Sequence, residues 1–500
     1  MTAFEEDYYD GSRIFSWLAD SIDLPIDQVN FLLAQFTALA MAGFLRTFLK
    51  PSVVSATTRH VFGLVMGVAL GYFCFGKQTI HLALLPGLCY IVMRTQNPRN
   101  LQRGVLTTAM VYLSCVHYHR QIYSYGSYTL DITGPLMVIT QKVTSLAYSI
   151  HDGLTRREEE LTPSQLKQAV KKMPSTLEYF SYVFHFQALM AGPVILYRDY
   201  IDFIQGHHLS GRKPLTGCDK NSSHYDEIIL EPSPIPVVVK KTITSLFFAA
   251  LLVTLMPRYP IQRVKDEDFL ANTTILQKFG YLMIATTLVR CKYYHAWIFV
   301  DAICNNSGLG FNGYKENGEP NWDLYSNVDV ISFETSQNLK ESIESWNKGT
   351  NQWLRSIMYD RTKSNKLMYT YALSALWHGF YPGYYLTFAN GAFFTVVSRI
   401  NRRKIRPYFL GSKSKKFLYD VISFVATRFL MAYISFSFVL LEFVPSIQMY
   451  LYLKMIPHLV GLAILVIGPF LPKIPAPGKV AEKEINASQE LINGTARKTM

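Results

Sequence analysis

The chain has 500 residues, of which 49% are hydrophobic, 14% are aromatic and only 17% are charged. Soluble proteins carry about 25% charged residues, and disordered chains are poor in aromatic residues. The composition therefore excludes a string of water-soluble domains and a disordered chain. It predicts a polytopic membrane protein.

Basic residues outnumber acidic ones, 49 against 36, which gives a formal net charge of +13. Such an excess is typical of the cytoplasmic loops of membrane proteins, and the basic clusters at residues 399–406 and 413–416 adjoin apolar stretches. We therefore expect contact with anionic lipid and no binding of nucleic acid. The six cysteines are scattered without a CxxC pair or a zinc-like Cys/His spacing, so neither a disulfide framework nor a metal site is expected.

Charge-free windows mark the expected membrane helices, because a charge at the centre of a bilayer costs about 2.5 kcal/mol or more. Together with three less clean spans they predict an all-α chain with about ten or eleven spanning or half-spanning helices. The charge-free windows are Val29–Leu45, Val61–Gly76, Gln78–Met93, Gly104–His119, Thr242–Met256, Leu367–Ser398 and Met455–Pro472. The less clean spans are Leu177–Tyr197, Thr274–Val300 and Phe417–Leu441.

The polar stretches between these windows are too short for independent domains. We expect a polar N-terminal segment over residues 1–28, one membrane domain over residues 29–472 and a flexible polar tail over residues 473–500. The acidic N-terminus does not resemble a cleaved signal peptide. No internal repeat is visible, which weakens the interpretation as a transporter with inverted repeats.

One apolar segment carries an unusual polar stripe. Between Ile132 and Ile150, the polar residues Gln141, Ser145 and Ser149 recur every four residues, and Lys142 lies beside them. Residues four apart share one face of a helix. Such a helix either lies in the membrane interface or faces an internal cavity, and the sequence leaves both alternatives open.

His378 lies in the longest charge-free window, within the run Ser374–Tyr385. Burial at membrane depth favours a neutral imidazole, which can accept a proton. A lone histidine in an apolar helix is usually a packed residue, but Pro382 must kink or end this helix because its ring clashes with the carbonyl of His378. Broken helices at membrane depth line cavities, so the combination predicts a pocket, with Ser374 and Tyr381 on the face of His378.

Asn347 follows Trp346 in a segment with charged residues around apolar positions at helical spacing. This pattern predicts an amphipathic helix near the interface. By itself Asn347 would be an ordinary surface amide, although it is able to face inwards.

The residues around Asn347 and His378 together resemble a known family. Trp346-Asn347, a spacer, Ser374–Gly379 and Tyr381–Tyr385 are similar to the signature of the membrane-bound O-acyltransferases, in particular their lysophospholipid branch. The resemblance covers residues 20–470, and within the branch it is strongest to the lysophosphatidylethanolamine and lysophosphatidylserine acyltransferases. Further matching segments are Leu24–Phe31, Gly134–Met137, Gln141–Lys142, His151–Leu154, Ala191–Pro193 and Lys292–Tyr294.

The resemblance implies an eleven-helix fold around an internal tunnel, with acyl-CoA entering from the cytosolic side and the lysophospholipid from the bilayer. His378 would be the catalytic histidine and Asn347 its partner. In acyl transfer to a lipid hydroxyl, His378 would act as general base, while Asn347 would either donate to the developing oxyanion or orient the hydroxyl. The remaining candidate substrate-binding residues are Ser374, Trp377, Tyr381, Trp346, Lys142 and Gln141.

Acyl-CoA is expected as a co-substrate, with no cofactor or metal, and the sequence does not indicate an oligomeric state. The alternatives are the same chemistry on diacylglycerol, a sterol or a peptide, and a proton-coupled transporter in which His378 relays protons. The basic pair Arg497-Lys498 near the C-terminus is similar to a retrieval signal. The resemblance also implies the endoplasmic reticulum, where this family usually remodels phospholipids. Together, the basic pair and the resemblance predict a multi-pass protein of the endoplasmic reticulum membrane.

Overall fold

The computed structural model describes residues 9–126, 129–209 and 232–472. Within these ranges every regular element is a helix, apart from an isolated β-bridge between Tyr314 and Pro320. The prediction of an all-α chain is therefore confirmed. The predicted flexible tail, residues 473–500, lies outside the described residues.

The helices belong to two compact units. Among the described residues, unit 1 comprises those up to Pro257 together with Leu288–Asp329 and Trp346–Tyr381. Unit 2 comprises Arg258–Thr287, Val330–Ser345 and the described residues from Pro382 on. One long helix, α12, begins in unit 2 and continues into unit 1.

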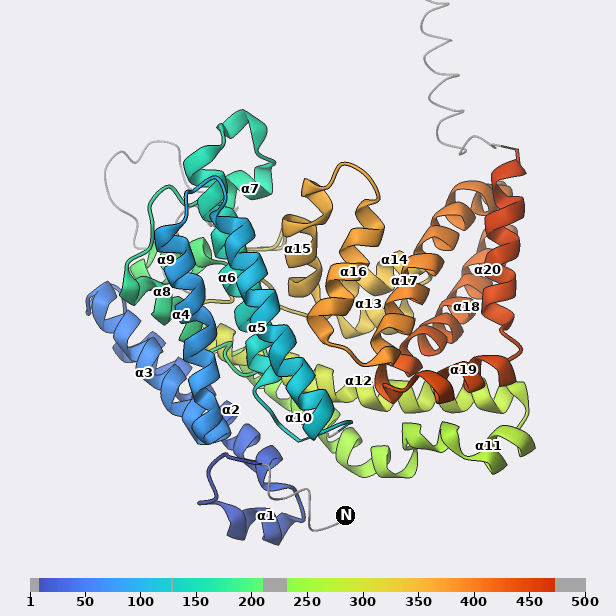
Figure 1. Cartoon of the computed structure of the whole chain (residues 1–500), viewed down its shortest axis with the longest axis horizontal. Helices are drawn as coiled ribbons and strands as arrows, with labels where there is room; N and C mark the ends of the chain where they lie inside the picture. The colour runs from blue at the N-terminus through green and yellow to red at the C-terminus, as the bar shows by residue number, and fades with distance from the viewer. Residues whose placement is uncertain (1–8, 127–128, 210–231, 473–500) are drawn as a thin grey trace, which may run out of the picture. The chain divides into compact units, whose positions relative to one another are not determined.

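Unit 1 is built around a layer in which α4, α5 and α6 lie side by side and pack pairwise against one another (Figure 1). The helix α15 packs against α6, and α16 packs against α5. The helices that lie within unit 1 are α1 (Ser16–Ile22), α2 (Ile26–Phe48), α3 (Ala56–Phe75), α4 (Thr79–Thr95), α5 (Leu101–Tyr123), α6 (Thr133–Thr155), α7 (Pro163–Gln168), α8 (Thr176–Phe184), α9 (Tyr197–Gln205), α10 (Ile235–Leu255), α15 (Lys348–Ile357) and α16 (Lys366–His378).

A close approach between α3 and α8 illustrates how tightly unit 1 is packed. A Cβ atom built on Gly67 of α3 would lie 1.7 Å from the carbonyl oxygen of Phe184, so only glycine fits at that position. The helix α8 begins with a capping box, in which the Ser175 hydroxyl accepts from the Glu178 N–H and the Glu178 carboxylate accepts from the Ser175 N–H. This reciprocal pair satisfies two backbone donors at the start of the helix.

Unit 2 has an aromatic core. Tyr433 and Tyr450 have ring centroids 4.7 Å apart, and Phe436 packs against Tyr450 at 4.8 Å. The helix α17 packs against α18 and α20 (Figure 1). The helices of unit 2 are α11 (Glu267–Asn272), the first part of α12 (Ile275–Asn306), α13 (Val330–Thr335), α14 (Leu339–Ser345), α17 (Pro382–Ile400), α18 (Lys413–Leu440), α19 (Phe443–Tyr452) and α20 (Ile456–Ile467).

Several described helices are long and apolar enough to cross a membrane. By length and composition there are four such stretches in the described residues, Ile26–Phe48, Ala56–Thr95, Ile235–Lys265 and Lys413–Leu440. The pair Phe443–Tyr452 and Ile456–Phe470, bent by 77°, is a fifth if it counts as one span. The polytopic character is thus confirmed, while the number of eleven spanning helices stays a prediction.

The expected span Leu177–Tyr197 is wrong as a continuous helix. Only α8 is helical in this region, and residues 185–196 run as turns and irregular chain. The run includes Gly192 in the left-handed region, with φ of 78°, followed by Pro193. A proline interior to a helix removes a backbone donor and clashes with the preceding turn, so an apolar composition alone was misleading here.

Candidate functional site

His378 is the last residue of α16, and α17 begins four residues later at Pro382. The predicted helix break is therefore confirmed. Gly379 follows with φ of 113°, a conformation that residues with a Cβ atom rarely adopt. His378 thus stands at a helix end, directly before a sharp change in chain direction.

The imidazole of His378 is fixed by its own helix. Its Nδ1 atom lies 2.8 Å from the carbonyl oxygen of Ser374, and since a carbonyl can only accept, Nδ1 carries the proton. The lone pair of the neutral ring is then on Nε2. His378 is partly exposed, whereas Ser374 and Trp377 are buried, so the imidazole is a partly accessible side chain in a packed segment.

A second imidazole supports this helix end. The Nε2 atom of His117, on α5, donates to the carbonyl oxygen of Trp377 at 3.1 Å. The last carbonyls of a helix lack partners within the helix, and the carbonyl of Trp377 belongs to the peptide group that leads into His378. A Cβ atom on Gly379 would lie 3.0 Å from Nδ1 of His117, so the ring of His117 contacts the chain on both sides of His378.

The sequence pattern predicts an amphipathic helix around Asn347. In the structure Asn347 lies just outside such a helix. The helix α14 ends at Ser345, and Asn347 precedes α15 in the left-handed region, with φ of 45° and ψ of 54°. Asparagine tolerates this conformation better than most residues. Asn347 therefore sits at a helix start, in a turn of defined geometry, and is partly exposed.

Asn327 holds the turn that contains Asn347. Its backbone carbonyl accepts from the N–H of Lys348 at 2.8 Å, and its Oδ1 atom accepts from the N–H of Gly349 at 2.9 Å. Its Nδ2 atom donates to Oδ1 of Asn347 at 3.2 Å. With Oδ1 engaged in this way, the amide of Asn347 directs its Nδ2 donor group away from Asn327.

One face of α6 supports both α15 and α16. The carbonyl of Met137 accepts from Nε1 of Trp377 at 3.1 Å, and Nε2 of Gln141 donates to the hydroxyl of Thr350 at 2.8 Å. Further along, Thr144 accepts from Nε1 of Trp353 at 2.9 Å, and Asp152 binds the guanidinium of Arg361. Positions 137, 141, 144 and 152 share one helical face, so a single helix positions the segments that carry Asn347 and His378.

The polar stripe of α6 is internal. All residues from Thr140 to Ala147 are buried, including Gln141 and Ser145 of the stripe, whereas Ser149 is partly exposed. The burial of Gln141 and Ser145 argues against the interfacial alternative. Lys142 points away from α15, since its ammonium donates to the carbonyl of Val183 at 3.0 Å and lies over the ring of Tyr182. Gln141 therefore contacts the α15 segment, whereas Lys142 contacts the segment around α8.

The two remaining predicted binding residues occupy different surroundings. Trp346 packs its ring against Tyr293, Tyr294 and Trp297 of α12, at centroid distances of 5.6, 5.8 and 4.9 Å. Tyr381 lies beyond the end of α16, and so it does not share a helical face with His378. Its hydroxyl accepts from the N–H of Gly126 at 3.2 Å.

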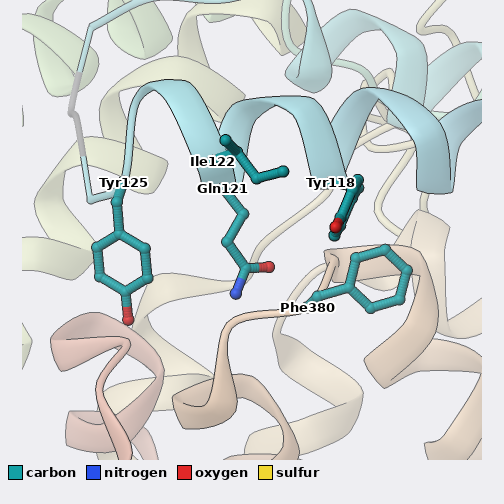
Figure 2. Close-up of a pocket in the computed structure, with 5 residues that line it drawn as sticks. All are labelled: Tyr118, Gln121, Ile122, Tyr125 and Phe380. Atoms are coloured by element: carbon teal, nitrogen blue, oxygen red, sulfur yellow. The ribbon is translucent and has the colours of Figure 1, made fainter.

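A pocket of about 570 Å³ adjoins the segment that follows His378. It is lined by Tyr118, Gln121, Ile122, Tyr125 and Phe380. Figure 2 shows Gln121 pointing from α5 into the space between Tyr125 and Phe380. The Oε1 atom of Gln121 is buried and has no hydrogen-bond partner among the described residues. The lining thus combines aromatic and aliphatic surface with the polar groups of Gln121, Tyr118 and Tyr125.

His117, Asn327 and Gln121 were missed by sequence reasoning. A signal existed for the two residues on α5, because Leu101, Val105, Ala109 and Leu113 form a buried stripe with four-residue spacing that His117 and Gln121 continue. No local signal marks Asn327, since its contacts are with residues twenty or more positions away along the chain. Among the described residues, no group of three or more His, Cys, Asp or Glu side chains is placed to hold a metal ion.

Comparison with known proteins places this site in context. The family model of the membrane-bound O-acyltransferases matches residues 118–443. This range includes Asn327, Asn347 and His378 and begins one residue after His117. The match covers more than half of the chain.

Individual relatives are similar over nearly the whole chain. The chain is 52% identical over 466 residues to lysophospholipid acyltransferase 6 of Drosophila melanogaster, covering 93% of this chain and 64% of that protein. It is 39% identical to membrane-bound glycerophospholipid O-acyltransferase 2 of Homo sapiens, covering 92% of this chain and 88% of that protein. It is 36% identical to membrane-bound glycerophospholipid O-acyltransferase 1 of Homo sapiens, with 93% of each covered.

Proposed function

Because the chain belongs to the membrane-bound O-acyltransferase family, we propose that it transfers a fatty acyl group from acyl-CoA to the free hydroxyl of a lysophospholipid. The observation that carries the proposal is the geometry of His378, a partly exposed residue whose Nδ1–H bond to Ser374 leaves Nε2 as the basic nitrogen of the ring. The names of the relatives support lysophospholipids as the acceptor class.

In the proposed reaction His378 removes the proton of the lipid hydroxyl as it attacks the thioester. An alcohol is a poor nucleophile until its proton is removed, and a positioned base contributes roughly 10²- to 10⁴-fold. The new ester bond forms as the carbon–sulfur bond breaks, and the proton taken by Nε2 passes to the leaving thiolate of CoA. No covalent acyl-enzyme is needed in this sequence.

The role proposed for Asn347 is that of a donor to the developing oxyanion. Since Oδ1 of Asn347 accepts from Asn327, the N–H group of its amide is the part directed elsewhere. Removing one such donor typically costs 10²- to 10³-fold in turnover. The alternative, in which Asn347 orients the hydroxyl as an acceptor, requires the opposite amide orientation.

For the acceptor we propose lysophosphatidylethanolamine or lysophosphatidylserine, with lysophosphatidylcholine as a further substrate. Both preferred headgroups carry an ammonium, and we propose Gln121 and the tyrosine hydroxyls in the lining of the pocket beside Phe380 as the polar groups that select it. Aromatic walls with a few polar groups are typical of sites that bind largely apolar ligands. The proposed setting is the endoplasmic reticulum membrane, and the proposed role is phospholipid remodelling.

The test is a competition in microsomes from cells that express the chain. Radiolabelled acyl-CoA is supplied with the ethanolamine, serine, choline and inositol lysophospholipids at equal concentration, and microsomes with His378→Ala are the control. We expect the ethanolamine or serine product to dominate with the wild type and to fall to background in the control. Labelled triacylglycerol, sterol ester or peptide in place of phospholipid would contradict the acceptor class, and dominant inositol product would contradict the headgroup.

A further inference from the structure

We propose that Asn327 is a positioning residue that sets the amide orientation of Asn347, so that Asn347 presents its N–H group to the reacting thioester. The inference rests on the proposed acyl transfer and deepens it, because it assigns a mechanism to a residue outside the matched pair of Asn347 and His378. It is carried by three hydrogen bonds between Asn327, which is buried, and the turn at residues 347–349.

The orientation follows from a chain of forced assignments that starts at a backbone group. The N–H of Gly349 can only donate, so the atom of Asn327 that lies 2.9 Å away must be the amide oxygen. The other end of that amide is therefore the NH₂ group, and it faces Asn347 at 3.2 Å. The atom of Asn347 that receives it must be Oδ1, which leaves its own NH₂ group on the opposite side.

The turn is built around Asn327, which cannot readily move. Asn327 is only 5% exposed, and its carbonyl is held by the N–H of Lys348. A Cβ atom on Gly349 would lie 3.2 Å from Oδ1 of Asn327, so the two residues are in close contact. Two of the three bonds of Asn327 to the turn are accepted from backbone N–H groups, so the fold itself holds Asn327 in place.

Asn327→Asp is the change that reverses the orientation with the least loss of structure. One carboxylate oxygen still accepts from Gly349, but the other replaces the NH₂ group and cannot donate to Asn347. The amide of Asn347 then turns its N–H group towards the carboxylate and its Oδ1 atom towards the substrate. An oxygen at that place repels the developing oxyanion instead of stabilising it.

The experiment measures kcat and KM of the full-length protein, purified in detergent, for acyl-CoA and for lysophosphatidylethanolamine. We expect Asn327→Asp to lower kcat by roughly 10- to 100-fold and to change either KM by less than about twofold. In an Asn347→Ala background the same change should have no further effect on kcat, because the two residues act through one contact. Asn317→Asp, an exposed asparagine that accepts from the N–H of Glu319, is the matched control and should retain wild-type kcat.

Several outcomes overturn the proposal. One is wild-type kcat in Asn327→Asp, and another is an equal fractional loss in the presence and absence of Asn347, which indicates a general structural role. If Asn327→Asp fails to accumulate, Asn327→Ser is tested in its place, and failure of both means that Asn327 serves stability alone. A wild-type protein that acylates no lysophospholipid contradicts the proposed function instead, so the two failures are distinguishable.

Discussion

The two units bury different kinds of polar residue. Unit 1 buries many charged, imidazole and amide side chains besides its hydroxyls, whereas the buried polar residues of unit 2 are mostly hydroxyls around an aromatic core, with Lys278 and Asn390 as exceptions. Those of unit 1 include Asn30, Gln35, Arg59, His60, His117, Gln141, Lys142, Asp152, His185 and Gln187. Those of unit 2 include Ser336, Ser342, Thr427, Ser437 and Ser446.

This difference shows which unit uses hydrogen bonds to fix the positions of its segments. Burying a polar group is costly unless it is hydrogen-bonded, and hydrogen bonds are directional where apolar packing is not. In unit 1 the bonds of His117, Gln141 and Asn327 converge on the segments that carry Asn347 and His378. The polar contacts of unit 1 should therefore determine turnover, and those of unit 2 should determine stability alone.

The largest effect is expected at His378. His378→Ala removes the proposed base without removing a large packing volume, so acyl transfer should fall by roughly 10²- to 10⁴-fold while the protein still accumulates and binds acyl-CoA. Turnover by the purified variant and equilibrium binding of acyl-CoA are the measurements. Wild-type-like turnover would reject the general-base assignment.

The next effect concerns the amide of Asn347. Asn347→Asp keeps the size of the side chain and the bond from Asn327, but it loses the donor, so kcat should fall by roughly 10² or more. Asn347→Ala should show a similar loss. If the aspartate variant retains most of its kcat while the alanine variant does not, Asn347 orients the hydroxyl and the donor role is wrong.

A smaller effect is expected at His117, which acts on the peptide group before His378. His117→Met removes the donor to Trp377 and should lower kcat about tenfold, since a small displacement of a reacting group is costly. His117→Gln has a similar length and retains an N–H donor, so it should recover most of that loss. Equal kcat in the two variants would show that the hydrogen bond does not matter, and His119→Leu on the exposed face of α5 serves as the control.

The smallest effect on turnover is expected in unit 2. The hydroxyl of Tyr450 accepts from Asn390 at 2.8 Å and donates to Ser437 at 3.2 Å, all within the core. Tyr450→Phe should lower the free energy of unfolding by about 1–3 kcal/mol and leave kcat within about twofold of wild type. Thermal unfolding measures the loss of stability, and turnover of the same preparation measures kcat. A large loss of kcat at unchanged stability would contradict the expectation that the polar contacts of unit 2 determine stability alone.

Much of the helical framework was predictable from charge-free windows. The windows at Val29–Leu45, Val61–Gly76 and Gly104–His119 each fall within or nearly within one observed helix, because a long apolar run has few other ways to satisfy its backbone in a membrane. The break after His378 was predictable from Pro382. The span proposed at Leu177–Tyr197 was not, because hydropathy does not distinguish a buried irregular segment from a spanning helix.

The sequence by itself determined the class of protein, the family and the two residues on which the chemistry is proposed to depend, since composition, Pro382 and the motif around His378 are local properties of the chain. Only the tertiary structure placed Asn347 in a left-handed turn and directed its amide. It also brought His117 to the end of α16 and one face of α6 against two later helices. These relations join residues as far as 260 positions apart, and a hydrogen bond at such a separation leaves no periodic trace in the residues on either side of it.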